Sequence, residues 1–185
     1  MIKKYVLYCP YCFSAFKHRF PTMAKKLNQL AEAELFDYSE LSAGEKALVD
    51  VAIATVDNAY APYSNFHVGA AVLLANGEVV KGSNQENAAY PSGLCAERVA
   101  IFSAGANFPK EAVEMIAIAA RPKGATDFVK ASSCGNCRQA MMEYESKQEQ
   151  PIQLLFVRPN NEVMKTTVGD LLPFGFDSNS LRGNS

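Results

Sequence analysis

Helical patterns of apolar and polar residues occupy four segments of the chain, and short apolar runs lie between them. The four segments comprise residues 23–40, 42–59, 96–106 and 136–147. In the second segment, Ser42 and Glu45 have the spacing of a capping box, and apolar positions follow at helical intervals, which predicts a helix that ends near Ala59. The first segment is polar and alanine-rich, and we also interpret it as helical.

Short apolar runs bounded by turn residues predict buried strands. The runs comprise residues 68–74, 78–82, 115–120, 152–157 and 163–167. Between the first two runs, the dipeptide Asn76-Gly77 strongly favours a β-hairpin. Helices that alternate with short buried strands predict an α/β fold, specifically a three-layer α/β/α sandwich around a mixed sheet of roughly five strands.

These elements define one compact domain over residues 41–176. Residues 1–40 are interpreted as an N-terminal extension and residues 177–185 as a flexible tail. Met23 is a candidate start of translation, in which case residues 1–22 are absent from the natural protein.

The charge and hydrophobicity of the 185 residues exclude several classes of partner. The formal net charge is −1 with acidic and basic residues interspersed, so no surface for nucleic acid or membrane is expected. No apolar run approaches the ~20 residues of a membrane span. Pro10 interrupts the apolar N-terminal stretch, and no small-residue cleavage site follows, which favours a cytoplasmic location over export.

The chain has five cysteines, an odd number that argues against a disulfide framework. Cys9 and Cys12 have the spacing of a redox pair, but no further ligands surround them, and a loose extension is the simpler interpretation. The other three, Cys95, Cys134 and Cys137, are better explained by metal binding or catalysis.

Cys95-Ala-Glu97 and Cys134-Gly-Asn-Cys137 carry the candidate chemistry. Positions i and i+2 of a helix point to different sides, so Cys95 and Glu97 converge only where Cys95 begins its helix. Cys134 and Cys137 can meet the same metal at the head of the next helix, with Gly135 letting the backbone turn. Three thiolates with one open position are typical of a catalytic zinc, and a neighbouring carboxylate can move the proton of an activated water.

A CxxC pair alone is a weak signal, but its combination with Cys-x-Glu matches the signature of zinc nucleobase deaminases in which Cys is the first ligand. Three thiolates and one Zn²⁺ carry a formal charge of about −1. We therefore interpret Arg98, which follows Glu97 directly, as the counter-charge of the site.

Five segments, in their order and spacing, resemble the motifs of the cytidine deaminase family over roughly residues 42–176. They read Tyr63-Ser-Asn-Phe-His-Val-Gly-Ala70, Asn84-Gln-Glu-Asn-Ala-Ala-Tyr90, Cys95-Ala-Glu-Arg98, Cys134-Gly-Asn-Cys-Arg-Gln139 and Leu171-Leu-Pro173. The resemblance implies hydrolysis of free cytidine and deoxycytidine to uridine and deoxyuridine plus ammonia, in pyrimidine salvage. It also implies one zinc ion per subunit and the homotetrameric branch of the family.

The same resemblance assigns roles at the reacting end of the site. Cys95, Cys134 and Cys137 are expected to hold the zinc ion. Glu97 is expected to activate water for attack on C4 and to protonate N3 and the leaving amine.

The resemblance also assigns the substrate contacts, which comprise Phe66, Asn84, Glu86, Ala96, Ser132 and Phe176. Asn84 and Glu86 are expected to bind the ribose hydroxyls, and Phe66 to pack near the sugar and base. The backbone N–H of Ala96 should donate to the base carbonyl, and the carbonyl of Ser132 should accept from the leaving amine. Phe176 matches an aromatic residue inserted from a neighbouring subunit, although Phe174 competes for this assignment.

One residue departs from the family pattern. Ser133 stands where the family usually has proline, and the loss of that rigid residue predicts weaker turnover or zinc retention.

Three alternative functions differ from this reading. A zinc deaminase for another cytosine compound, such as a nucleoside antibiotic, is disfavoured by Asn84 and Glu86. A polynucleotide-editing deaminase would need a basic, aromatic groove, and the balanced charge of the chain argues against one. An inactive zinc-binding assembly protein would have no need of Glu97.

Overall fold

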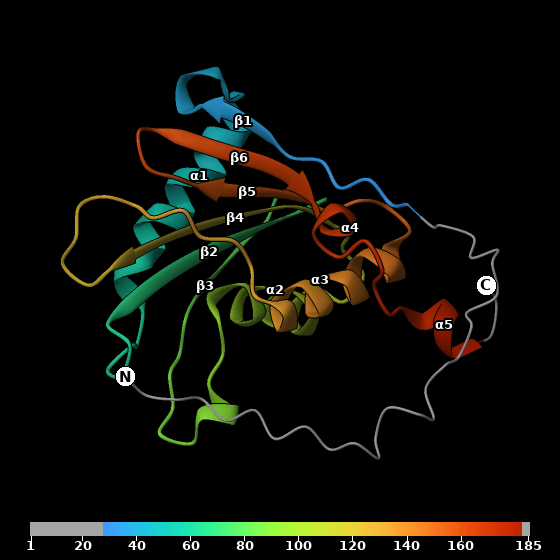
Figure 1. Cartoon of the computed structure of the whole chain (residues 1–185). Coiled ribbons are helices and arrows are strands. Elements are labelled where there is room, and N and C mark those ends of the chain that lie inside the picture. The colour runs from blue at the N-terminus through green and yellow to red at the C-terminus, as the bar shows by residue number, and fades with distance from the viewer. Residues whose placement is uncertain (1–27, 183–185) are drawn as a thin grey trace, which may run out of the picture.

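The computed structural model of the chain describes residues 28–182 (Figure 1). Within this range the strands form one six-stranded sheet with the order β1-β6-β5-β4-β2-β3. The strands are β1 (Glu34–Asp37), β2 (Phe66–Leu74), β3 (Val79–Ser83), β4 (Val113–Pro122), β5 (Gln153–Val157) and β6 (Glu162–Thr167). Strands β4 and β5 are parallel, and the other neighbouring pairs are antiparallel, so the sheet is mixed as predicted.

Helices cover both faces of this sheet. The described helices are α1 (Ala43–Thr55), α2 (Ala96–Asn107), α3 (Gly135–Gln148), α4 (Val168–Leu171) and α5 (Ser178–Arg182). Short 3-10 turns are η1 (Tyr38–Glu40), η2 (Val56–Asn58) and η3 (Tyr90–Ser92). Helix α1 lies behind the sheet, and α2 and α3 lie side by side in front of it (Figure 1). The predicted α/β class and three-layer arrangement are therefore confirmed.

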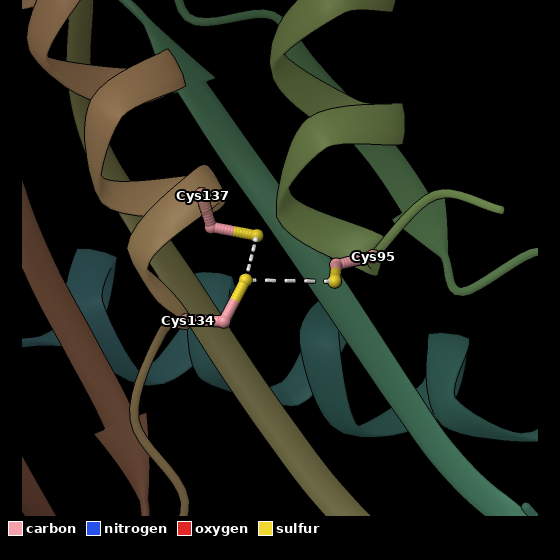
Figure 2. Close-up of side chains that lie close together, drawn as sticks. All are labelled: Cys95, Cys134 and Cys137. Atoms are coloured by element: carbon pink, nitrogen blue, oxygen red, sulfur yellow. Dashed lines mark hydrogen bonds between the residues drawn. The ribbon is translucent and has the colours of Figure 1, made fainter. Parts of the chain in front are cut away.

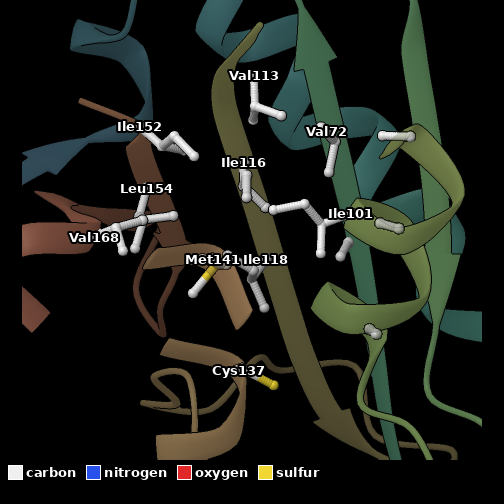
Figure 3. Close-up of a cluster of buried hydrophobic side chains, with 14 of the residues drawn as sticks. Val72, Ile101, Val113, Ile116, Ile118, Cys137, Met141, Ile152, Leu154 and Val168 are labelled. Carbon is white, nitrogen blue, oxygen red and sulfur yellow. The ribbon is translucent and has the colours of Figure 1, made fainter. Parts of the chain in front are cut away.

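The side chains of the strands alternate between these two layers. Ala70 and Val72 of β2 pack in the cluster with α2 and α3, whereas Ala71 packs with α1. Figure 3 shows the first cluster, which contains Ile116 and extends to Cys137 at the start of α3. The hydrophobic core thus fixes the end of α3 that carries two of the three candidate ligands.

The predicted helix over residues 23–40 is wrong where the structure describes it. Residues 28–33 have no regular structure, and β1 pairs with the edge of β6, with Phe36 opposite Val163. This edge strand raises the count from the predicted five to six. Its pairing depends on a segment more than a hundred residues away, which local periodicity does not reveal. The remainder of the predicted helix, with Cys9 and Cys12, lies outside the described residues.

The predicted hairpin at Asn76-Gly77 is confirmed. The N–H of Gly77 donates to the Leu74 carbonyl at 2.8 Å, and the N–H of Leu74 donates to Glu78 at 2.9 Å. Gly77 has a φ of 85°, a left-handed conformation that glycine adopts without strain.

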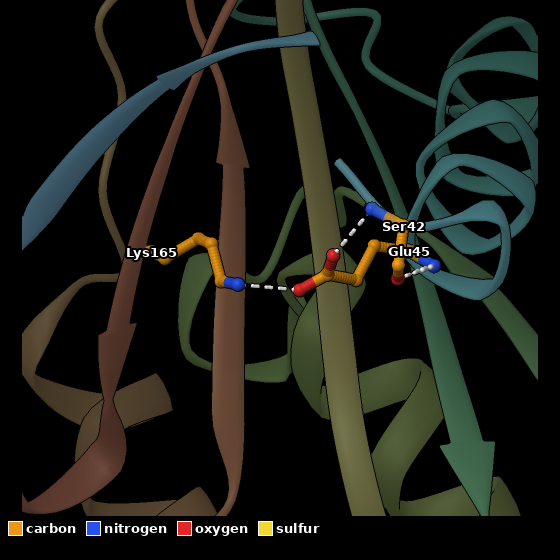
Figure 4. Close-up of polar contacts among 3 residues, drawn as sticks. All are labelled: Ser42, Glu45 and Lys165. Carbon is orange, nitrogen blue, oxygen red and sulfur yellow. Dashed lines mark hydrogen bonds and ion pairs between the residues drawn. The ribbon is translucent and has the colours of Figure 1, made fainter. Parts of the chain in front are cut away.

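The capping box at the start of α1 is also confirmed, and it is extended by an ion pair (Figure 4). The N–H of Ser42 donates to Glu45 Oε2 at 2.8 Å, and the N–H of Glu45 donates to Ser42 Oγ at 3.3 Å. Lys165 of β6 contacts the other carboxylate oxygen of Glu45. This hydrogen bond from Lys165, with those from Ser42, lowers the pKa of Glu45 to about 2.

The predicted tail contains the short helix α5, at whose start the N–H of Ser180 donates to Asp177 Oδ1 at 2.9 Å. Among the helices described within residues 28–182, none has the length and apolar character required to cross a membrane.

Candidate metal centre and active site

The N-termini of α2 and α3 bring three cysteines together (Figure 2). Cys95 is the N-cap of α2, Cys134 is the N-cap of α3, and Cys137 lies in the first turn of α3. The Cys134 sulfur is 3.9 Å from that of Cys95 and 3.5 Å from that of Cys137. All three sulfurs lie within 4.8 Å of one another. The expectation that Cys95 begins its helix is confirmed.

This triangle of sulfurs has the dimensions of a zinc site. Thiolates bound at about 2.3 Å to a tetrahedral zinc lie about 3.8 Å from one another. The 3.9 Å and 3.5 Å separations are close to that value. Gly135 needs no glycine-specific conformation, because its φ is not positive and a Cβ atom there would meet nothing within 4 Å.

Proton sharing and a cation favour a thiolate in this cluster. The Cys137 thiol donates toward Cys95, and together with Arg98 it lowers the pKa of Cys95 to about 5. The same contact with Cys95, together with burial, raises the pKa of Cys137. Arg98 Nη2 is 4.0 Å from the Cys95 sulfur and 3.4 Å from the Gly93 carbonyl. Its Nε is buried without a hydrogen-bond partner in the described part of the chain.

Glu97 lies in the first turn of α2 with 5% of its surface exposed. Burial is the main cause that raises the pKa of this carboxyl. A hydrogen bond that Ser133 Oγ donates to Glu97 Oε1 at 2.9 Å acts in the opposite direction. The structure therefore places one buried carboxyl group beside the start of the helix that carries Cys95.

An open cleft of about 520 Å³ adjoins the cysteine cluster. Its lining comprises Tyr63, Ser64, Asn84, Gln85, Glu86, Asn87, Tyr90, Gly93, Leu94, Cys95 and Arg98. Cys95 of the cysteine cluster therefore lines the same cleft as Asn84 and Glu86, the two residues predicted to bind the ribose hydroxyls.

Asn84 and Glu86 are held by the protein but retain hydrogen-bonding capacity. Asn84 Oδ1 accepts from Val68 N at 2.8 Å, and its Nδ2 donates to the Phe66 carbonyl at 2.9 Å. Each group forms one of the two hydrogen bonds available to it. Glu86 accepts from Ser64 Oγ and from the N–H groups of Tyr63 and Ser64, and these bonds lower its pKa.

The other predicted substrate contacts are placed less uniformly. Ala96 is the fully buried first residue of α2, where a helix leaves its N–H groups without intrahelical partners. Ser132 is exposed directly before the cluster, and Phe66 is half-buried and outside the cleft lining. Phe174 and Phe176 are 73% and 56% exposed, so neither packs into the core of its own chain.

Two residues near the cysteine cluster, Ser133 and Arg138, make contacts that the sequence did not predict. Ser133, expected to loosen its turn, is 2% exposed and contacts Glu97. Arg138 Nε donates to the Ser133 carbonyl at 2.8 Å, and its Nη1 donates to the Leu171 carbonyl at 3.0 Å. These contacts link segments that are distant in sequence, and only the Cys-Arg-Gln motif pointed toward Arg138.

The segment that carries the cysteine cluster is also shared with known proteins. Residues 43–150, which include all three cysteines of the cluster, match the family described as the cytidine and deoxycytidylate deaminase zinc-binding region. The chain belongs to this family. As a family member it is an enzyme, a hydrolytic deaminase.

Individual relatives agree with this assignment. Cytidine deaminase from Halalkalibacterium halodurans is 34% identical over 136 residues, which cover 72% of this chain and 95% of the relative. The crystal structure of cytidine deaminase from Burkholderia pseudomallei is 38% identical with a TM-score of 0.59, covering 70% of this chain and 97% of that one. A blasticidin-S deaminase from Bacillus cereus is 28% identical over 75% of this chain and 96% of its own length.

Proposed function

We propose that this deaminase hydrolyses free cytidine and deoxycytidine to uridine and deoxyuridine plus ammonia, as a step of pyrimidine salvage. The main support is the three-cysteine cluster, with a buried Glu97 beside it and a cleft that leads from Cys95 to Asn84 and Glu86. A redox or structural cysteine cluster would need neither the carboxyl group nor the cleft.

In this proposal, Cys95, Cys134 and Cys137 hold one zinc ion, which the separation of their sulfurs fits. Zinc in such a site lowers the pKa of water and thereby supplies a nucleophile at neutral pH. Arg98 offsets the negative charge of the thiolates, since its guanidinium lies against Cys95.

Glu97 moves the protons of the reaction. It accepts a proton from water as the water oxygen forms a bond to C4 of the cytosine ring, and it delivers that proton to N3. It then carries the second proton of the water to the amine, the C4–N bond breaks, and ammonia leaves. A buried carboxyl with a raised pKa is suited to both accept and donate a proton.

The cleft orients the nucleoside around this carboxyl. Asn84 and Glu86 bind the ribose hydroxyls with the donor and acceptor positions that their internal hydrogen bonds leave available. The N–H of Ala96 donates to the base carbonyl, the Ser132 carbonyl accepts from the leaving amine, and Phe66 supports the sugar and base.

The aromatic residues near the C-terminus complete the site in an oligomer. We propose that the enzyme is a homotetramer in which Phe176, or alternatively Phe174, covers the base in a neighbouring subunit. The exposure of both rings supports this role.

The test is to incubate the zinc-loaded enzyme with cytidine and to follow uridine and ammonia, with Glu97→Gln in parallel. Conversion by the wild type, with a loss of at least about 100-fold in the variant, would support the reaction and the proton carrier together. No conversion by the wild type, with zinc still bound, would contradict the proposal and favour another cytosine nucleoside as the substrate.

A second candidate substrate is a cytosine nucleoside antibiotic, which the similarity to blasticidin-S deaminase favours. A competition assay separates the two candidates. If cytidine suppresses deamination of blasticidin S at equal concentration, the plain nucleoside is the substrate; the opposite result would favour the antibiotic.

A further inference from the structure

Ser133 and Glu97 form a contact between the two helix starts that carry the cysteine cluster. Ser133 directly precedes Cys134 at the start of α3, and Glu97 lies in the first turn of α2. Their side chains meet at 2.9 Å, and the two residues are 2% and 5% exposed. A carboxylate only accepts hydrogen bonds, so the hydroxyl of Ser133 is the donor.

The backbone of Ser133 is restrained by Arg138. Arg138 Nε donates to the Ser133 carbonyl at 2.8 Å, and Nη1 of the same guanidinium donates to the carbonyl of Leu171 at 3.0 Å. Arg138 therefore holds the backbone of Ser133 against α4. A planar guanidinium that bridges two carbonyls restrains that backbone more than a single bond would.

We propose that Ser133 is a positioning residue, which holds the carboxylate of Glu97 in one orientation beside the cysteine cluster by donating a hydrogen bond to Oε1. This inference rests on the proposed function, because it gives Glu97 the role of proton carrier. In this role Ser133 acts differently from the proline that the family usually has at this position. Proline restrains the backbone before the second ligand, whereas Ser133 restrains the carboxylate itself and leaves the backbone to Arg138.

This arrangement also replaces the expectation that serine weakens the site. A buried carboxylate without a fixed donor samples several rotamers, and small displacements of a reacting group reduce turnover. The Ser133 hydroxyl removes that freedom without adding a ligand to the metal. It should therefore affect turnover and leave binding of nucleoside and zinc unchanged.

The test compares two substitutions of equal shape, Ser133→Thr and Ser133→Val, of which only the first keeps a hydroxyl. We expect Ser133→Val to lower kcat by about 10-fold to 100-fold relative to Ser133→Thr, as is typical when an outer partner of a metal site is lost. KM and zinc affinity, measured by competition with a chelator, should be the same in both. Thr166→Val serves as control, because it removes another buried hydrogen bond of a hydroxyl, the one to the Glu32 carbonyl, which involves neither Glu97 nor the cysteines.

A second readout does not depend on turnover. Infrared difference spectra of the zinc-loaded proteins should show a shifted carboxylate band in Ser133→Val, the wild-type band in Ser133→Thr, and no such band in Glu97→Gln. Equal kcat and equal bands in the two substitutions would overturn the inference, as would a fall in zinc affinity that accounts for the lost turnover. If Ser133→Val does not fold, Ser133→Ala is compared with the wild type by the same criteria.

The two proposals fail in distinguishable ways. Absence of cytidine turnover in the wild-type enzyme contradicts the proposed function, whereas the infrared comparison still tests the contact. Normal wild-type turnover that Glu97→Gln abolishes and Ser133→Val leaves intact contradicts only the role of Ser133.

Discussion

Helices α1 and α2 pack on opposite faces of one sheet and begin in similar ways, yet only α2 carries the candidate chemistry. Each has a glutamate in its first turn, Glu45 in α1 and Glu97 in α2. Each also crosses a strand at a glycine, Gly69 for α1 and Gly82 for α2, where a Cβ atom would collide with helix backbone.

The two helix starts differ in the partners of their polar groups. Glu45 forms hydrogen bonds with Ser42 and an ion pair with Lys165, and these contacts lower its pKa to about 2. Glu97 has no cation against it among the described residues, and burial raises its pKa. The N-cap of α2 is Cys95, whose side chain makes no capping hydrogen bond to the helix. A helix start satisfied internally stabilises the fold, whereas one left unsatisfied is available to a metal and a substrate.

Replacement of Cys95, the N-cap of α2, is expected to have the largest effect on turnover and zinc binding. Cys95→Ser should abolish turnover and weaken zinc binding about 100-fold or more, because one of three thiolates is lost. Serine is a favourable N-cap, so the metal-free protein should not lose stability. Zinc titration and urea unfolding of the metal-free protein measure these effects.

The matched control is Ser42→Ala at the N-cap of α1. It should leave zinc binding intact and lower the free energy of unfolding by about 1 kcal/mol. Full zinc affinity in Cys95→Ser would contradict the assignment of Cys95 as a ligand.

Removal of the carboxylate charge separates the two glutamates. Glu97→Gln should reduce kcat by about 10²-fold to 10⁴-fold, the usual contribution of a general acid–base group. Glu45→Gln, the same substitution in α1, should leave kcat unchanged and lower only the melting temperature. Similar losses of activity in both variants would show that the helix starts act through stability alone. Steady-state kinetics with cytidine and thermal melts provide the comparison.

The two glycine crossings give a smaller effect. Gly82→Ala brings a Cβ atom to 2.5 Å from Ala100 N and 2.6 Å from the Ala96 carbonyl, and such overpacking costs about 1–3 kcal/mol. Because Ala96 follows Cys95, zinc affinity should also fall, by about 10-fold.

Gly69→Ala is the control on the other face, with its nearest contacts at Ala52 and Val56. It should lose similar stability in urea unfolding without a change in zinc affinity. Equal zinc affinities in the two variants would show that the α2 crossing does not position the cluster.

The pH dependence of the Glu45 ion pair gives the smallest effect. The pKa of Glu45 is about 2 in the folded chain against an ordinary 4.5, so this carboxylate stabilises the fold fully above pH 4.5. The stabilisation is lost as the pH falls toward 2. Lys165→Met should lower the free energy of unfolding by about 1 kcal/mol at neutral pH and by less near pH 2. Urea unfolding at several pH values measures this, and a difference independent of pH would contradict it.

Interactions between residues close in sequence allowed several local structures of this chain to be predicted. The capping box at Ser42, the hairpin at Gly77 and the helix starts at Cys95 and Cys134 all depend on neighbours within a few positions. Such signals persist in the folded chain because the backbone hydrogen bonds that they satisfy are local. The spacing of three cysteines and Glu97 was therefore enough to indicate the metal centre.

Contacts between distant segments supplied what local patterns did not contain. β1 forms because β6 offers an unpaired edge, although the composition of its segment favours a helix. The opposite pKa shifts of Glu45 and Glu97 arise from Lys165 in one case and burial in the other. From the sequence alone, serine in place of proline at position 133 predicts a looser turn. The contact of Ser133 with Glu97 exists only because α2 and α3 pack side by side. Pairing, burial and charge are set by neighbours in space, and the order of residues along a chain does not specify those neighbours locally.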